Sequence, residues 1–163
     1  MLEDRLDAGC RIAWFRVQLP VKPNGSTGWV RREDVLVGRL NARIVVDESQ
    51  KRLYLYKRGV VVFSSPAAIG KPSTPTPRGR FYVTQRLIPV SRNGPFGPRA
   101  LGTSAHSTVL TTWVDGGPVG IHGTNEPFSV GRPVSHGCIR LPNAKIVRLF
   151  ALTPLGTPVV VRR

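Results

Sequence analysis

The stretch Val134-Ser135-His136-Gly137-Cys138-Ile139-Arg140-Leu141 places a histidine, a glycine and a cysteine side by side, and Gly120-Ile121-His122-Gly123-Thr124 precedes it with a second histidine. A thiol attacks a carbonyl carbon as its thiolate, so it needs a nearby base. On an extended strand, His136 would share a face with Cys138, two residues away, whereas His122 could reach the thiol from a neighbouring strand. Gly137 lets the backbone bend, so that amides around Cys138 can face a developing oxyanion. The two segments predict a cysteine nucleophile with a histidine base.

The combination of these two segments resembles the signature of the L,D-transpeptidases with a YkuD-type (ErfK/YbiS-type) catalytic domain. Either half alone would be a weak signal, but together they are specific. The resemblance implies a cysteine-dependent acyltransferase that cross-links peptidoglycan stem peptides. Many members carry Asn two positions after the nucleophile; this chain has Arg140, which also occurs in the family.

The resemblance also implies roles for individual residues. Cys138 is expected to be the nucleophile, His122 the general base, and the Gly123 carbonyl the group that orients the imidazole. The backbone amides of Gly137 and Cys138 are the expected oxyanion donors. Candidates for binding substrate or holding the loop are Arg140, His136, Ser135 and Thr124.

The implied reaction has two halves. Cys138 attacks the carbonyl of the third stem residue and expels D-Ala, and the side-chain amine of another stem then resolves the thioester into a 3→3 cross-link. Water in place of the amine would make the enzyme an L,D-carboxypeptidase. Carbapenems are expected to acylate the cysteine. No cofactor or metal is expected, and the expected location is the cell envelope, outside the cytoplasm.

Composition favours a mainly β fold. The 163 residues include 17 Gly and 15 Pro, which favour turns over long helices, and the apolar runs are short and rich in β-branched and aromatic residues. With the resemblance, this predicts a β-sandwich-like catalytic domain over residues 39–163. Residues 1–38 are predicted to be a β-hairpin extension, with its hairpin over 11–37, or the remnant of an SH3-like module.

Within the catalytic domain, strands are predicted at 44–47, 53–56, 60–63, 107–114 and 159–162, and one short helix at 142–152. The stretch 67–83, with its Thr-Pro-Thr-Pro-x-Gly-x-Phe pattern, is expected to be a rigid extended loop that shapes the donor cleft or is purely structural. By the same resemblance, a Gly/Pro-rich loop over 89–103 is expected to border the active site. Within it, Arg92 and Arg99 either contact a stem carboxylate or are solvated. His106 is expected to be structural or exposed.

The chain is strongly basic, with a net charge of +15 from 24 basic and 9 acidic residues. Such a charge attracts polyanions. No nucleic-acid-binding motif is present, so nucleic acid is not expected as a partner, and anionic wall polymers account for the charge equally well. No apolar run of membrane-spanning length occurs, and the acidic segment 1–7 is unlike a signal peptide, so any export signal is expected to be absent from this chain. Cys10 is expected to be a free, non-catalytic thiol.

Three other interpretations compete with the transpeptidase. A zinc ion could be bound by His122, His136 and Cys138, but no fourth ligand is evident. A cysteine protease or a sortase-like transpeptidase that acts on proteins also uses Cys, His and Arg, but the Ser-His-Gly-Cys-Ile-Arg arrangement does not resemble the sortase pattern. A catalytically silent basic module would bind wall polymer or nucleic acid, and this binding would weaken with added salt but persist in Cys138→Ala.

Overall fold

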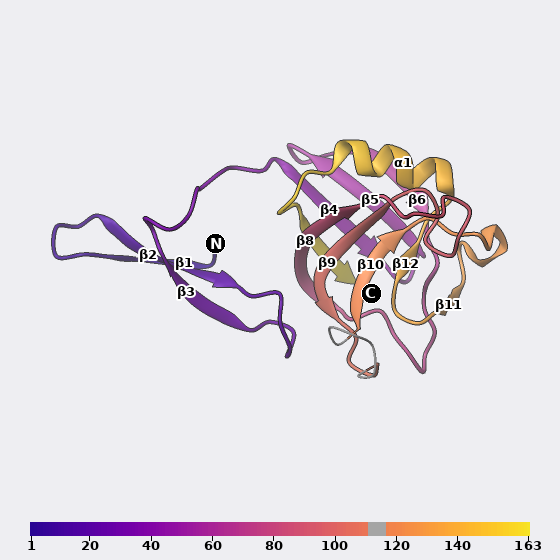
Figure 1. Cartoon of the computed structure of the whole chain (residues 1–163), viewed down its shortest axis with the longest axis horizontal. Coiled ribbons are helices and arrows are strands. Elements are labelled where there is room, and N and C mark those ends of the chain that lie inside the picture. Colours follow the sequence, from indigo (N-terminus) through magenta and orange to yellow (C-terminus); the bar gives the residue numbers. More distant parts are fainter. Residues whose placement is uncertain (111–116) are drawn as a thin grey trace.

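The computed structural model describes residues 1–110 and 117–163. They form a small N-terminal sheet and a larger β domain, joined by an extended segment (Figure 1). The strands fall into a three-stranded sheet, an eight-stranded sheet and a two-stranded ladder. The predicted mainly β fold is confirmed.

The N-terminal sheet is an antiparallel meander of β1 (Glu3–Leu6), β2 (Ile12–Gln18) and β3 (Thr27–Arg31). The hairpin predicted over 11–37 is present as β2 and β3. Strand β1 was not predicted, and it pairs with the free edge of β2. All four of its side chains are exposed, so no hydrophobic alternation marks it in the sequence. That residues 1–38 are the remnant of an SH3-like module stays a prediction.

The eight-stranded sheet has the order β12-β10-β9-β8-β13-β4-β5-β6. Its strands are β4 (Ala42–Asp47), β5 (Arg52–Lys57), β6 (Val60–Pro66), β8 (Gly79–Leu87), β9 (Ala100–His106), β10 (Pro118–His122), β12 (Ile139–Arg140) and β13 (Pro158–Arg162). Neighbouring strands are antiparallel except β10 with β12 and β13 with β4. A short parallel ladder of β7 (Ile69–Gly70) and β11 (Pro133–Ser135) lies outside this sheet. Strands β4, β5, β6 and β13 confirm four of the predicted strands.

The two halves of the curled sheet share one core, as in a sandwich. Ile44 and Leu53 from one half belong to the same buried cluster as Leu101 and Ile121 from the other. Full burial of each such side chain stabilises the fold by roughly 1.5–3 kcal/mol. The core thus fixes β9 and β10, which carry much of the candidate site, against β4 and β5.

The single α-helix, α1 (Asn143–Leu152), confirms the helix predicted at 142–152. It begins directly after Pro142, whose fixed φ suits a helix start. It crosses one end of the sheet (Figure 1) and buries Ile146 and Leu149 in the core. In residues 1–110 and 117–163, no helix has the length and apolarity of a membrane span.

Two predictions around β9 are wrong, namely the extent of the loop over 89–103 and the strand over 107–114. The loop predicted over 89–103 ends at Ala100, where this strand begins, and the described part of the strand predicted over 107–114 (107–110) is not a strand. Residues 111–114 of that prediction lie outside the described residues. Strand β9 is composed mainly of small residues with weak strand preference, and pairing with β8 and β10 on both edges overrides that preference.

Candidate active site

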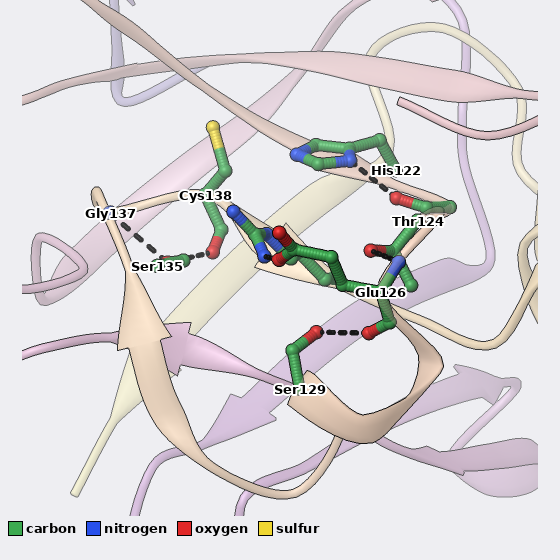
Figure 2. Close-up of polar contacts among 9 residues, drawn as sticks. His122, Thr124, Glu126, Ser129, Ser135, Gly137 and Cys138 are labelled. Atoms are coloured by element: carbon green, nitrogen blue, oxygen red, sulfur yellow. Dashed lines mark hydrogen bonds and ion pairs between the residues drawn. The ribbon is translucent and has the colours of Figure 1, made fainter. Parts of the chain in front are cut away.

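The turn that carries Cys138 is shaped by Ser135. This side chain is fully buried; its hydroxyl donates to the Cys138 carbonyl at 2.6 Å and accepts from the Gly137 amide at 3.1 Å (Figure 2). Gly137 has φ +112°, a conformation that side-chain-bearing residues rarely adopt. The Gly137 amide was expected to face an oxyanion, but in this structure it is directed at Ser135 inside the turn.

The stretch 67–83 is not one extended loop as predicted, because Ile69–Gly70 pairs as β7 and β8 begins at Gly79. The proline-rich part between them, 71–78, is a loop that holds the turn carrying Cys138. Thr74 donates its hydroxyl hydrogen to the Ser135 carbonyl at 3.1 Å, and Thr76 donates to the Gly137 carbonyl at 2.9 Å. The Thr76 oxygen also accepts from the Gly70 amide at 2.9 Å. Both threonines are buried, so these bonds are shielded from water. Segment 71–78 therefore fixes the nucleophile turn through its threonines.

His122 ends β10, next to β12, and its ring is fixed by a backbone carbonyl. Its Nδ1 lies 2.6 Å from the Gly123 oxygen (Figure 2). A carbonyl only accepts, so Nδ1 carries the proton and Nε2 of the neutral ring has the free lone pair. In Figure 2 this second nitrogen is on the side of the ring that faces the Cys138 sulfur. The arrangement is that of a base directed at the thiol.

Gly123 is required at its position by close packing. A Cβ atom there would lie 2.3 Å from Oδ1 of Asn143. That oxygen accepts a hydrogen bond from the Thr124 amide at 2.8 Å, which ties the end of β10 to the start of α1. The Thr124 side chain is buried, and its hydroxyl oxygen accepts from the Glu126 amide. Sequence reasoning missed Asn143, which no pattern singled out.

The parallel register of β10 and β12 brings the thiol beside β10. Ile121 pairs with Ile139, so Cys138 lies next to Gly120, and the Gly120 amide donates to the Cys138 sulfur at 3.4 Å. This donor was also missed, although the sequence motif contains it. The Cys138 amide makes no hydrogen bond to another described residue. It is therefore available as an oxyanion donor where the Gly137 amide is not.

The environment keeps both the His122 imidazole and the Cys138 thiol neutral. Burial lowers the pKa of His122 to about 4, and the positive charge of Arg140 acts in the same direction, against the hydrogen bond to Gly123. Burial also raises the pKa of the Cys138 thiol, although the Gly120 amide and Arg140 oppose this. At neutral pH the resting pair is therefore a thiol and a neutral imidazole.

His122 and Cys138 line one cavity of about 430 Å³ on the face formed by β8, β9 and β10. Phe96, from the Gly/Pro-rich loop, also lines it and packs edge-on against the His122 ring, with the centroids 5.1 Å apart. The loop thus borders the site as predicted. Arg99 lies instead beside Phe150 of α1, and Arg92 is exposed.

Arg140 lies near His122 and Cys138, but its charge is already engaged in an ion pair. Its guanidinium forms a partly buried ion pair with Glu126, a residue that sequence reasoning did not single out. Its backbone exchanges two hydrogen bonds with Ala68. The charge that Arg140 presents to His122 and Cys138 is therefore partly neutralised.

The other cysteine and the other histidines lie at different distances from His122 and Cys138. The expected strand face shared by His136 and Cys138 does not form, because residues 136–138 are not a strand; His136 is exposed and is not among the residues that line the cavity. Cys10 is an exposed free thiol in the N-terminal sheet region. His106 is buried and lines the same cavity as Cys138. Within residues 1–110 and 117–163, no three His, Cys, Asp or Glu side chains are grouped to hold a metal ion.

Comparison with known proteins identifies the family. The family model of the YkuD L,D-transpeptidase catalytic domain matches residues 41–161. This chain belongs to that family. The family inferred from the two motif segments is thereby confirmed.

Individual similar proteins support the same family assignment. The putative L,D-transpeptidase YkuD of Bacillus licheniformis is 39% identical over 117 residues, which cover 72% of this chain and 63% of that protein. The solved structure of the LD transpeptidase LdtMt1 in complex with imipenem is 27% identical, with a TM-score of 0.56, and the match covers 75% of this chain and 59% of that one. An L,D-transpeptidase from Mycobacterium smegmatis, 21% identical, shares the fold over 93% of this chain and 78% of its own, with a TM-score of 0.62. The chain thus spans less than two thirds of the Bacillus relative's length.

Proposed function

We propose that this chain is a peptidoglycan L,D-transpeptidase that forms 3→3 cross-links through an acyl-enzyme on Cys138. The observation that carries the proposal is that His122 and Cys138 line one cavity, with the His122 ring held by Gly123 so that its basic nitrogen faces the thiol. Family membership and the imipenem complex of the similar LdtMt1 support it.

In the first half-reaction, the Cys138 sulfur attacks the carbonyl carbon of the third stem residue, a diamino acid such as meso-diaminopimelate. The thiol proton moves to Nε2 of His122 as the S–C bond forms, because the resting pair is neutral. The oxyanion is stabilised by the Cys138 amide. The C–N bond to D-Ala then breaks, its nitrogen takes the proton from His122, and a thioester remains.

In the second half-reaction, the side-chain amine of another stem attacks the thioester. His122 accepts a proton from this amine and returns one to the departing sulfur, which restores the thiol. The product is an amide between two third residues. Water at this step would release a tripeptide, so the supply of amine at the cavity decides between cross-linking and hydrolysis.

The other candidate residues take supporting roles in this proposal. Ser135 and Thr124 hold the two segments that carry Cys138 and His122, as their burial and hydrogen bonds favour. Arg140 attracts a donor carboxylate when that group displaces Glu126. His136, on the exposed side of the turn, contacts the donor outside the cavity.

The charge distribution supports an anionic substrate in the cell envelope. Residues 39–163 contain 18 basic and 4 acidic residues, a net charge of +14, whereas residues 1–38 contain 6 and 5, a net charge of +1. The positive field therefore comes from the catalytic domain, and it steers stem peptides, which carry carboxylates, towards the site.

The test is the intact mass of the protein after incubation with imipenem, followed by peptide mapping. We expect one adduct, on Cys138, in the wild type and in Cys10→Ala, and none in Cys138→Ala. The wild type is then given a stem tetrapeptide, with and without an amine acceptor, and the products are separated by mass. An adduct on Cys10, or no release of D-Ala, would contradict the proposal; a tripeptide alone would make the chain an L,D-carboxypeptidase.

A further inference from the structure

The N-terminal sheet is attached to the catalytic domain at the end of β9. The side-chain amide of Asn24 donates to the His106 carbonyl at 2.8 Å, and the His106 amide donates to the Asn24 side-chain oxygen at 2.8 Å. Asn24 thus pairs with the backbone of His106 as a neighbouring strand would. In the same loop, Lys22 donates to the Leu110 carbonyl at 3.3 Å.

This attachment reaches the catalytic cavity. Pro20, from the same loop, and the His106 side chain both line the cavity that holds Cys138. His106 pairs with Pro118 at the start of β10, four residues before His122. Cys138 lies beside Gly120, two residues from Pro118, so at about 3.3 Å per residue the thiol is roughly 7 Å along β10 from this wall. Pro20 and His106 are the far wall.

The His106 side chain is suited to bind a polar group. The residue is 9% exposed, and its Nδ1 is buried without a hydrogen-bond partner among residues 1–110 and 117–163. Its backbone is held on both sides, by Asn24 and by the β10 ladder. The imidazole is thus a fixed polar group in a cavity whose other far-wall residue, Pro20, has no side-chain donor.

We propose that the N-terminal sheet is part of the substrate site: Asn24 positions His106, and His106 and Pro20 bind the N-terminal end of the donor stem peptide. This inference rests on the function proposed above. Only one residue, D-Ala, follows the bond that is broken, and one residue spans roughly 3.4 Å, which is short of a wall about 7 Å from the thiol. The two stem residues that precede the reacting residue span about 7 Å at the same rise.

The test compares Asn24→Ala with Gln18→Ala on two donors. Gln18 is a matched control because its side chain also joins the N-terminal sheet to the catalytic domain, by a 2.9 Å bond to the Arg80 carbonyl, but it does not line the cavity. For the full tetrapeptide donor, we expect Asn24→Ala to raise KM about tenfold with kcat changed less than twofold. A blocked dipeptide donor that lacks the first two stem residues, and imipenem, should react with this variant at the wild-type rate within twofold.

A second variant tests the wall without touching the attachment. Pro20 is exposed, so Pro20→Trp leaves the fold intact but narrows the far end of the cavity. It should likewise slow the tetrapeptide and spare the dipeptide donor. Equal effects on both donors, an effect of Gln18→Ala as large as that of Asn24→Ala, or no effect of Asn24→Ala would overturn the inference. Failure of the proposed function is a separate result, because imipenem would then leave the wild type unmodified.

Discussion

The two ends of the catalytic cavity are built in different ways. At the Cys138 end, His122 ends β10 and Cys138 directly precedes the neighbouring strand β12, and hydrogen bonds from Thr76 and Ser135 fix the turn. At the far wall, Pro20 and His106 come from two sheets that meet through side-chain hydrogen bonds. The end proposed to perform the chemistry is thus part of the folding core, whereas the end proposed to select substrate is assembled at a boundary between two sheets.

This difference has a physical consequence. A bond-making site needs its groups fixed within a fraction of an ångström, which a paired sheet and a shared core provide. A wall that binds the part of a peptide remote from the bond that is broken can be changed without disturbing the acyl-transfer groups. Substitutions at the Cys138 end should therefore affect both turnover and stability, and those at the far wall should affect the choice of substrate.

The largest effect is expected for the nucleophile itself. Cys138→Ala removes the proposed nucleophile, so turnover of a stem tetrapeptide should fall by about 10³-fold or more. The measurement is release of D-Ala, with Cys10→Ala as the control that removes the other thiol and keeps wild-type activity. Comparable activity in Cys138→Ala would show that Cys138 is not the nucleophile, and the two ends of the cavity would then not differ in their chemistry.

The next effect is on the pH dependence of stability. The pKa of His122 is about 4 in the folded chain and near 6.5 when unfolded, so the folded state binds fewer protons between these values. The contribution of neutral His122 to the free energy of unfolding is therefore fully present above about pH 6.5. It falls by about 3 kcal/mol as the pH drops towards 4. Urea unfolding at pH 4.5 and 7 should show this loss in the wild type and much less of it in His122→Gln. Parallel losses in both proteins would mean that other groups are responsible.

A smaller effect tests the support beneath the turn. Thr76→Val keeps the side-chain shape but leaves the Gly70 amide and the Gly137 carbonyl without their partner. We expect a loss of about 2 kcal/mol in the free energy of unfolding, together with slower acylation by imipenem. Thr108→Val, at an exposed position, is the control and should be neutral. Unchanged stability would show that the prolines alone stiffen the loop.

The smallest effect is expected at the ion pair beside the site. Glu126→Gln should change stability by less than about 1 kcal/mol, because the pair is partly exposed to solvent. Arg140 would then be unneutralised and would lower the pKa of the Cys138 thiol further. Alkylation of Cys138 by iodoacetamide, measured in a Cys10→Ala background, should therefore become faster. Slower alkylation would indicate that Glu126 helps to hold the turn.

Some elements were predictable because their signals are local. The helix α1 follows a proline and has apolar residues at helical spacing, and β4, β5 and β13 are rich in β-branched or aromatic residues. Strand β9 was missed because pairing on both edges, rather than its own composition, makes it a strand. The exposed β1 was missed because it has no buried face.

The sequence by itself identified the family and predicted the two residues at the centre of the proposed chemistry, since the two short motifs that contain Cys138 and His122 are specific to that family in combination. It also indicated the mainly β fold. Only the tertiary structure decided that Thr76 supports a turn 61 residues away and that Asn24 pairs with His106 over a separation of 82. Such bonds join a side chain to a backbone atom, and because every residue has the same backbone groups, the partner leaves no pattern in the sequence.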